Sequence, residues 1–164
     1  MAYALLPNSV MPTHIQVRDV PERPALLVHA RFPNSQISAE LGRIFGDVMR
    51  WAGQPAVTTS GQAFARYARW DGGQCELDAG FVVDRAPQTA DAPVTVGHVG
   101  GCLAACATHF GPYDTVSETY ASMQQWMTTN GYVPDGGMWE EYLTPPGTPP
   151  DQIRTDVFWP VKKA

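Results

Sequence analysis

Hydrophobic and polar positions form two similar series of short segments along the chain, and Pro and Gly mark the breaks between them. In the first series, the pattern predicts strands over 14–20 and 25–32, a helix from Ile37 to about residue 53, and strands over 62–70 and 74–83. In the second series, it predicts strands over 94–99 and 102–110, a helix from Val116 to about Asn130, and strands over 138–143 and 153–161. The order strand, strand, helix, strand, strand therefore occurs twice.

This repeated order favours an internal duplication, with pseudo-repeats over 14–84 and 94–161 joined by the polar, Pro-rich linker 85–93. We expect one α+β domain over 14–161, preceded by an N-terminal arm over 1–13. Tandem βαββ units would build an antiparallel sheet with both helices on one face. The other face would then be free to form a ligand cleft between the two halves.

Composition narrows the possible classes of function. The chain has 164 residues, enough for one sizeable core, and only 16% of them are charged. The net charge is -5 and the 11 Lys and Arg residues are scattered, so we expect no direct binding of nucleic acid. No apolar run approaches the ~20 residues of a membrane span, and no signal peptide precedes the domain. We therefore expect a cytoplasmic location and no membrane association.

Three cysteines raise the question of a disulfide or a metal site. Reduced thiols are expected in a chain without an export signal. Cys102 and Cys106 share one face of a predicted strand, with His98 and His109 on either side, but small core cysteines are the favoured interpretation. The chain has no phosphate-binding glycine loop, and no Ser-His-Asp order can be argued. We expect no metal and no cofactor.

The second half carries several motifs in a fixed order. They are His109-Phe-Gly-Pro-Tyr113, Tyr120, the helix end from Trp126 to Tyr132, Glu140-Glu141-Tyr142-Leu143, and Pro160-Val161. With their spacing, these pieces resemble the GyrI-like family, the effector-binding domain found alone or fused to AraC-type and MerR-type DNA-binding domains. The resemblance covers 94–161 closely and 14–84 mainly through layout. No helix-turn-helix pattern precedes the domain, so we do not expect a complete transcription factor.

The resemblance implies a tandem βαββ fold with a ligand cleft between the halves. Members of this family bind bulky aromatic or cationic compounds, and the glutamate of the Glu-x-Tyr-Leu motif, here Glu140, is typically the buried acid at the cleft floor. Some stand-alone members resemble hydrolases that open the strained cyclopropane rings of alkylating natural products. Others restrain DNA gyrase or sequester drugs.

Strand alternation orders the candidate residues around Glu140. Glu140 and Tyr142 should share one face, and Trp139, Glu141 and Leu143 the other, unless a bulge brings Trp139 round. Glu140 can attract a cation or act as a general acid or base, and aromatic walls suit flat or cationic ligands. The alternative is that Glu140 is exposed or pairs with Arg66 or Arg154. The predicted ligand-binding residues are Glu140, Tyr142, Tyr67, Tyr113, Trp139 and Phe158.

Three functions follow as hypotheses. The first is a binding module that captures a small aromatic or cationic ligand, for sensing or for sequestration in drug resistance. The second is a hydrolase that opens strained rings, with Glu140 and Tyr142 as its catalytic residues. The third is a protein-interaction role, such as restraint of gyrase.

Overall fold

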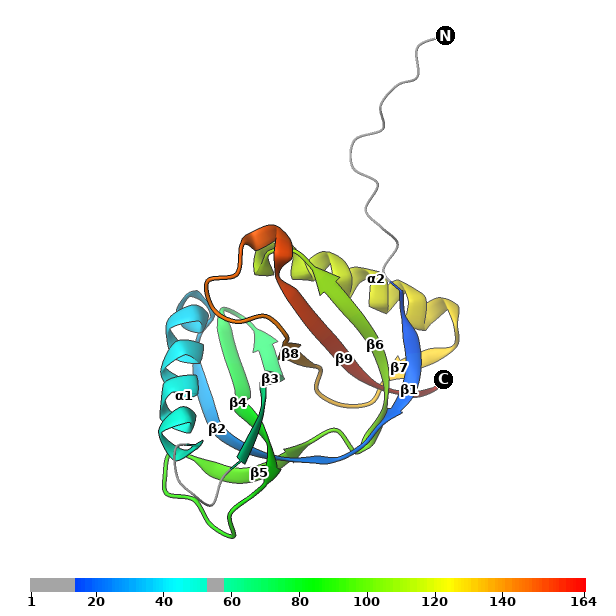
Figure 1. The fold of residues 1–164 in the computed structure, drawn as a ribbon. Coiled ribbons are helices and arrows are strands. Elements are labelled where there is room, and N and C mark those ends of the chain that lie inside the picture. Colours follow the sequence, from blue (N-terminus) through cyan, green and yellow to red (C-terminus); the bar gives the residue numbers. More distant parts are fainter. Residues whose placement is uncertain (1–13, 53–57) are drawn as a thin grey trace.

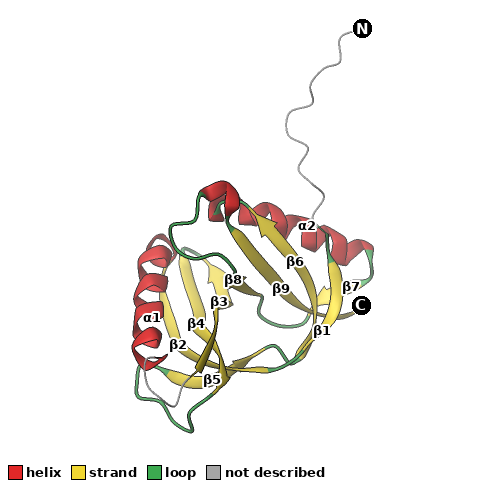
Figure 2. Cartoon of the chain, in the orientation of Figure 1, coloured by secondary structure: helices red, strands yellow, loops and turns green. Residues whose placement is uncertain are grey.

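A computed structural model describes residues 14–52 and 58–164, so the predicted arm over 1–13 lies outside the described residues. The strands are β1 Gln16–Val20, β2 Arg23–Pro33, β3 Thr58–Asp71, β4 Gln74–Arg85, β5 Thr95–Val99, β6 Cys102–Phe110, β7 Tyr132–Pro134, β8 Trp139–Tyr142 and β9 Arg154–Lys163. The helices are α1 Ile37–Ala52 and α2 Val116–Thr129, and the single 3-10 turns are η1 Asn34–Gln36, η2 Tyr113–Thr115 and η3 Pro150–Gln152. Figure 2 shows these elements as one curled sheet with helices outside it.

The sheet is antiparallel and runs in the order β1-β6-β9-β8-β3-β4-β2-β5, with β7 paired to β9. The predicted α+β class and the repeated order of elements are confirmed. Figure 1 shows that the two halves meet along the middle of the sheet, where β8 lies beside β3. The short strand β7 was not predicted, because its three residues are too few for a periodic pattern.

The two halves exchange their first strands. β1 pairs with β6 of the second half, and β5 pairs with β2 of the first half. The end of β1 and the turn between β5 and β6 meet where the Gly101 N–H donates a hydrogen bond of 2.8 Å to the Val20 carbonyl oxygen. At neighbouring Gly100, which has a φ of +90°, a Cβ atom would lie 2.3 Å from the Pro21 carbonyl oxygen. Glycine is therefore required for this close backbone approach.

Both helices cover the outer side of the curled sheet (Figure 1). Ile44 and Val48 of α1 pack into a core with Leu26 and Leu77 of the first half. Met123 and Met127 of α2 pack into a second core, whose buried sheet residues are Ala105, Ala107, Val157 and Val161. These apolar stripes bury the helices against the sheet, which is the arrangement that the helical spacing predicts.

A third core lies on the inner, helix-free side of the sheet. Phe64, Val82 and Cys106 are buried there, and the rings of Trp139 and Phe158 stack with centroids 4.8 Å apart. Cys106 is thus a buried free thiol in an apolar core, as the core interpretation of the cysteines predicts. No helix in the described part of the chain is long and apolar enough to cross a membrane.

Candidate functional site

Strand β8 places two adjacent carboxylates on opposite sides of the sheet. It pairs with β3 in a regular register, Ala65 opposite Glu140 and Arg66 opposite Trp139, with no bulge between them. On its other edge, Glu140 lies opposite Val157, which belongs to the core under α2. Because cross-strand partners share a face, Glu140 points to the helix side. It does not point to the helix-free side, on which we expected the cleft.

Glu140 is almost completely buried, with 4% of its surface exposed. The Tyr142 hydroxyl donates a hydrogen bond of 2.8 Å to its Oε2 atom. Burial raises the pKa of Glu140 to about 7, and hydrogen bonding from Tyr142 and Tyr67 lowers it only in part. The carboxyl is therefore poised between its charged and neutral forms near neutral pH.

Three phenols lie around this carboxyl, and each keeps its proton more strongly than a free tyrosine. Burial raises the pKa of Tyr67, Tyr142 and Tyr113, and the negative charge of Glu140 raises each of them further. All three hydroxyls are therefore neutral donors at physiological pH. Neutral donors stabilise the ionised carboxylate without neutralising it.

Aromatic rings enclose the site through edge-to-face contacts. Phe45 of α1 packs on Tyr142 with a centroid distance of 6.1 Å, and it also packs on Phe81 at 5.5 Å. Tyr113 of η2 also packs on Tyr142, with a centroid distance of 5.8 Å. Tyr113 is 46% exposed, so the rings lead from solvent down to the buried acid.

Tyr67 also packs against a partly exposed aromatic ring. Its ring contacts Trp70 at 5.8 Å, and Trp70 is 55% exposed at the end of β3. The Glu140 site, defined here as Glu140, Tyr67, Tyr142, Tyr113, Phe45 and Phe81, thus has two partly exposed edges.

The structure brings four of the six predicted site residues together. Glu140, Tyr142, Tyr67 and Tyr113 form the Glu140 site, whereas Trp139 and Phe158 stack on each other across the sheet. The regular register of β8 explains this separation, because only a bulge would have turned Trp139 toward Glu140.

The arginines considered as partners of Glu140 are engaged elsewhere. Arg66 forms an ion pair of 2.8 Å with Asp78, and the Arg154 guanidinium lies 5.3 Å from the centroid of the Phe110 ring. Within residues 14–52 and 58–164, no Lys, Arg or His pairs with Glu140. The buried acid therefore lacks a basic partner in this part of the protein.

Glu141, by contrast, is fully paired on the helix-free side. Arg23 forms an ion pair with Glu141 Oε1, and the Trp139 indole N–H donates to the same oxygen at 3.1 Å. Arg23 comes from β2, 118 residues away in the chain. This arrangement is typical of a structural ion pair.

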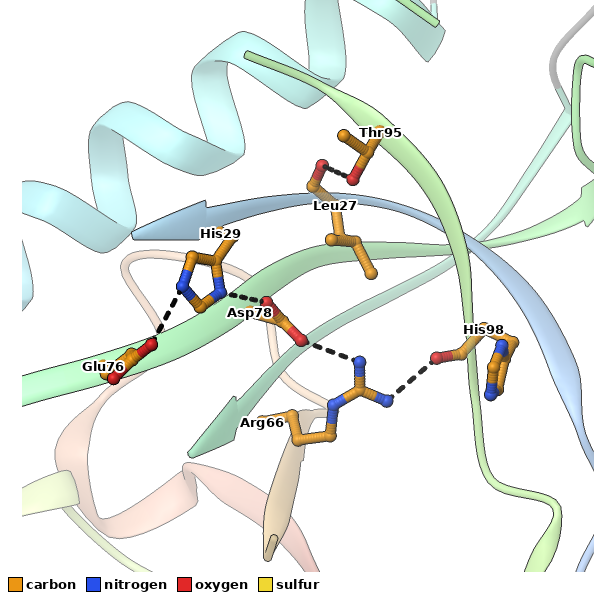
Figure 3. Close-up of polar contacts among 7 residues, drawn as sticks. All are labelled: Leu27, His29, Arg66, Glu76, Asp78, Thr95 and His98. Carbon is orange, nitrogen blue, oxygen red and sulfur yellow. Dashed lines mark hydrogen bonds and ion pairs between the residues drawn. The ribbon is translucent and has the colours of Figure 1, made fainter. Parts of the chain in front are cut away.

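Further polar side chains on the helix-free side also pair with one another (Figure 3). His29 lies between Asp78, at 2.7 Å, and Glu76, at 3.1 Å. Its hydrogen bond with Asp78 is the main reason that the pKa of His29 is raised. Arg66 bridges Asp78 and the carbonyl oxygen of His98. We assign this network to the stability of the sheet.

Two cavities lie away from Glu140. One of about 280 Å³ is lined on the helix-free side by Arg18, Thr108 and Phe158, among others. Another of about 580 Å³ lies at the strand ends beside Phe110 and Leu143. The part of the chain that the structure describes contains no cluster of His, Cys, Asp and Glu that could hold a metal ion.

Sequence reasoning missed several side chains near the acid. Phe45 is absent from the predicted site residues, because helical spacing says nothing about its contact with Tyr142 on β8. Thr155, opposite Tyr142 on β9, carries no sequence signal either. Its proximity depends on the pairing of β8 with β9, which local periodicity does not determine.

Comparisons with known proteins identify the fold and the family of this chain. No curated protein matches the sequence. Among solved structures, the C-terminal domain of EcmrR aligns with a TM-score of 0.78 and 20% identity, over 94% of this chain and 100% of that domain. EcmrR in its DNA complex aligns with a TM-score of 0.78 and 18% identity over 94% of this chain, which spans only 59% of that EcmrR chain.

Two further structures are similar to this chain. SAV2435 bound to tetraphenylphosphonium aligns with a TM-score of 0.63 and 14% identity, over 93% of this chain and 94% of that one. A hydrolase from Listeria innocua aligns with a TM-score of 0.60 and 16% identity, over 90% and 91%. At these identities the likeness shows a shared fold. The model of the GyrI-like small molecule binding domain matches residues 13–162, and the chain therefore belongs to that family.

Proposed function

We propose that this chain binds bulky aromatic cations at the Glu140 site, for sensing or for sequestration. One observation carries the proposal: a carboxyl with 4% exposure sits among aromatic rings and has no basic partner within the described residues. A buried carboxylate without a counter-charge is costly. A cationic ligand would supply the missing charge.

The surroundings of Glu140 favour an organic cation over a metal ion. Its neighbours are the rings of Tyr142, Tyr67 and Phe45, and aromatic faces attract delocalised cations that are weakly hydrated. A metal ion would need several oxygen or nitrogen ligands, and the described residues offer no such cluster. SAV2435, which shares the fold, is bound to tetraphenylphosphonium, a cation of this chemical class.

A ligand can reach Glu140 only if an aromatic side chain moves, because the carboxyl is covered. Tyr113 is the side chain most suited to move. It lies in the single turn η2, it is 46% exposed, and its ring packs on Tyr142 from the outside. Rotation of this ring would uncover Tyr142 and then Glu140.

Calorimetric titration with tetraphenylphosphonium tests the proposal. Saturable binding at one site is expected, and Glu140→Gln should weaken it by roughly 100-fold, because a carboxylate and a cation in an apolar site interact strongly. The matched control is Glu118→Gln, which removes an exposed carboxylate on α2. Equal affinity of both variants and the wild type, or no saturable binding, would contradict the proposal.

A second candidate function is hydrolysis of a strained ring. The observation that favours it is the carboxyl whose pKa is about 7, hydrogen-bonded to Tyr142, since such a group can take and return a proton at neutral pH. Glu140 would take a proton from water while the water oxygen bonds to a cyclopropane carbon. The ring carbon–carbon bond would break, and its electron pair would end on the leaving carbon framework, which then takes up the proton.

Incubation with a cyclopropane-bearing alkylator decides between binding and turnover. If the chain is a hydrolase, mass spectrometry will detect a product heavier than the substrate by one water, formed faster than with Glu140→Gln. Product formation at the same rate with both proteins would exclude hydrolysis of that compound and leave the binding proposal intact.

A further inference from the structure

Thr155 is a fully buried hydroxyl without a hydrogen-bond partner. Its exposed fraction is 0%, and its Oγ1 atom has no partner among the described residues. Burying a polar group without a hydrogen-bond partner costs free energy, so such groups are rare in native proteins and often have a functional reason. The position of Thr155 beside the Glu140 site offers one.

Thr155 lies in a cross-strand row with two residues that face the helix side. It is opposite Tyr142 on β8 and opposite His109 on β6. Since residues two apart on a strand share a face, Thr155 shares the face of Val157, and Val157 is opposite Glu140. Thr155 is therefore the diagonal neighbour of Glu140, at a side-chain separation of about 5–8 Å.

Neither neighbour in the row hydrogen-bonds the Thr155 hydroxyl, and each has other partners. His109 Nδ1 contacts Thr119 Oγ1 at 2.8 Å, and its Nε2 contacts the Pro112 carbonyl oxygen at 3.0 Å. The Tyr142 hydroxyl proton is donated to Glu140. The row thus contains one free hydroxyl between two groups that are already hydrogen-bonded.

We infer that Thr155 is a specificity-determining residue of the Glu140 site, and that it hydrogen-bonds a hydroxyl or carbonyl group on the bound cation. The inference rests on the proposed function. It narrows the ligand class to aromatic cations with a polar substituent about 5–8 Å from the positive centre. This distance matches the separation of the Glu140 and Thr155 side chains. The positive centre lies at Glu140, and the substituent lies beside Tyr142.

A pair of ligands that differ in one hydroxyl tests this inference. Tetraphenylphosphonium has no hydrogen-bonding group, whereas (4-hydroxyphenyl)triphenylphosphonium carries one hydroxyl on one ring. Calorimetry should give a wild-type preference of about tenfold for the hydroxylated cation, because it alone pairs the buried hydroxyl. Thr155→Val, which keeps the shape and removes the hydroxyl, should bind both cations with equal affinity.

Two further variants keep the test decisive. Thr155→Ser retains a hydroxyl and should retain the preference, even if Thr155→Val folds poorly. Thr108→Val is the matched control, because Thr108 Oγ1 already donates to Asp156 at 2.6 Å on the other side of the sheet. This control should leave the ratio of the two affinities unchanged.

The outcomes separate the inference from the function on which it rests. Equal affinity of the wild type for both cations, or a preference that survives in Thr155→Val, overturns the role of Thr155 while the cation site stands. No binding of either cation overturns the proposed function, and the role of Thr155 with it.

Discussion

The hydroxyl of Tyr142 donates a hydrogen bond of 2.8 Å to Oε2 of Glu140, a residue two positions earlier on the same strand. Period-two alternation places both side chains on one face, so a single four-residue strand supplies the acid and its donor. Burial favours the protonated acid, and this donor favours the ionised one. The balance between the two sets the pH at which the site is charged.

Removing the donor should therefore shift that pH upward. Tyr142→Phe keeps the ring contacts with Phe45 and Tyr113 but loses the hydrogen bond to the carboxylate. The pKa of Glu140 should rise by about one unit, since hydrogen bonds to charged groups are the stronger ones. The midpoint of the pH dependence of tetraphenylphosphonium affinity reports the shift.

Tyr132→Phe is the control for this change, because Tyr132 stacks on Trp126, away from Glu140. It should leave the midpoint unchanged. A midpoint in Tyr142→Phe equal to that of the wild type would mean that the hydrogen bond does not stabilise the ionised form.

Glu140 should also impose a pH dependence on stability. Its folded-state pKa of about 7 is above the ordinary value of 4.5, so the folded protein retains a proton that the unfolded chain releases. The stabilisation is fully present below pH 4.5 and is lost as the pH rises through about 7. The free energy of unfolding of the wild type should fall by about 3 kcal/mol relative to Glu140→Gln across this window.

Urea unfolding of both proteins at pH 4.5 and pH 8 measures the difference. Other shifted groups, such as the raised pKa of His29 and the lowered pKa of Asp78, are present in both proteins and cancel. A constant gap between the two unfolding free energies over this range would contradict the raised pKa of Glu140.

The sequence was sufficient to separate the two faces of β8, because alternation is a local property. It placed Glu140 with Tyr142 and away from Glu141, and the structure agrees. The side of the sheet that receives Glu140 was not predictable, since it depends on the neighbouring strands. Arg23, which pairs with Glu141 over a separation of 118 residues, depends on the same long-range order.

Charge removal at Glu141 should affect stability and leave ligand binding unchanged. Glu141→Gln removes the counter-charge of Arg23 and should lower the free energy of unfolding by about 2 kcal/mol. This value is below that of a fully buried pair, because the Arg23 side chain is 29% exposed. The affinity for tetraphenylphosphonium should change less than twofold, since Glu141 lies on the opposite side from Glu140.

The double variant Arg23→Met/Glu141→Gln should recover part of that loss. It removes the unpaired charge, and the glutamine oxygen can still accept from the Trp139 indole. Additive losses in the double variant would show that the ion pair has no coupling energy. A large loss of ligand affinity in Glu141→Gln would show that the two faces of β8 do not act independently.

A ligand can enter the Glu140 site at either of its two partly exposed edges. Two partly exposed rings border it, Tyr113 against Tyr142 and Trp70 against Tyr67. Trp70 belongs to the long hairpin of β3 and β4, in which it is paired with Cys75. Tyr113 follows Gly111, which has a φ of +120°, and lies in a single 3-10 turn. The Tyr113 backbone is held by fewer sheet contacts than the Trp70 backbone, so the Tyr113 side is the expected entrance.

Tyr113→Ala should therefore raise the association rate constant of tetraphenylphosphonium in stopped-flow measurements by roughly tenfold, whereas Trp70→Ala should leave it nearly unchanged. The reverse order of the two rate constants would place the entrance beside Trp70.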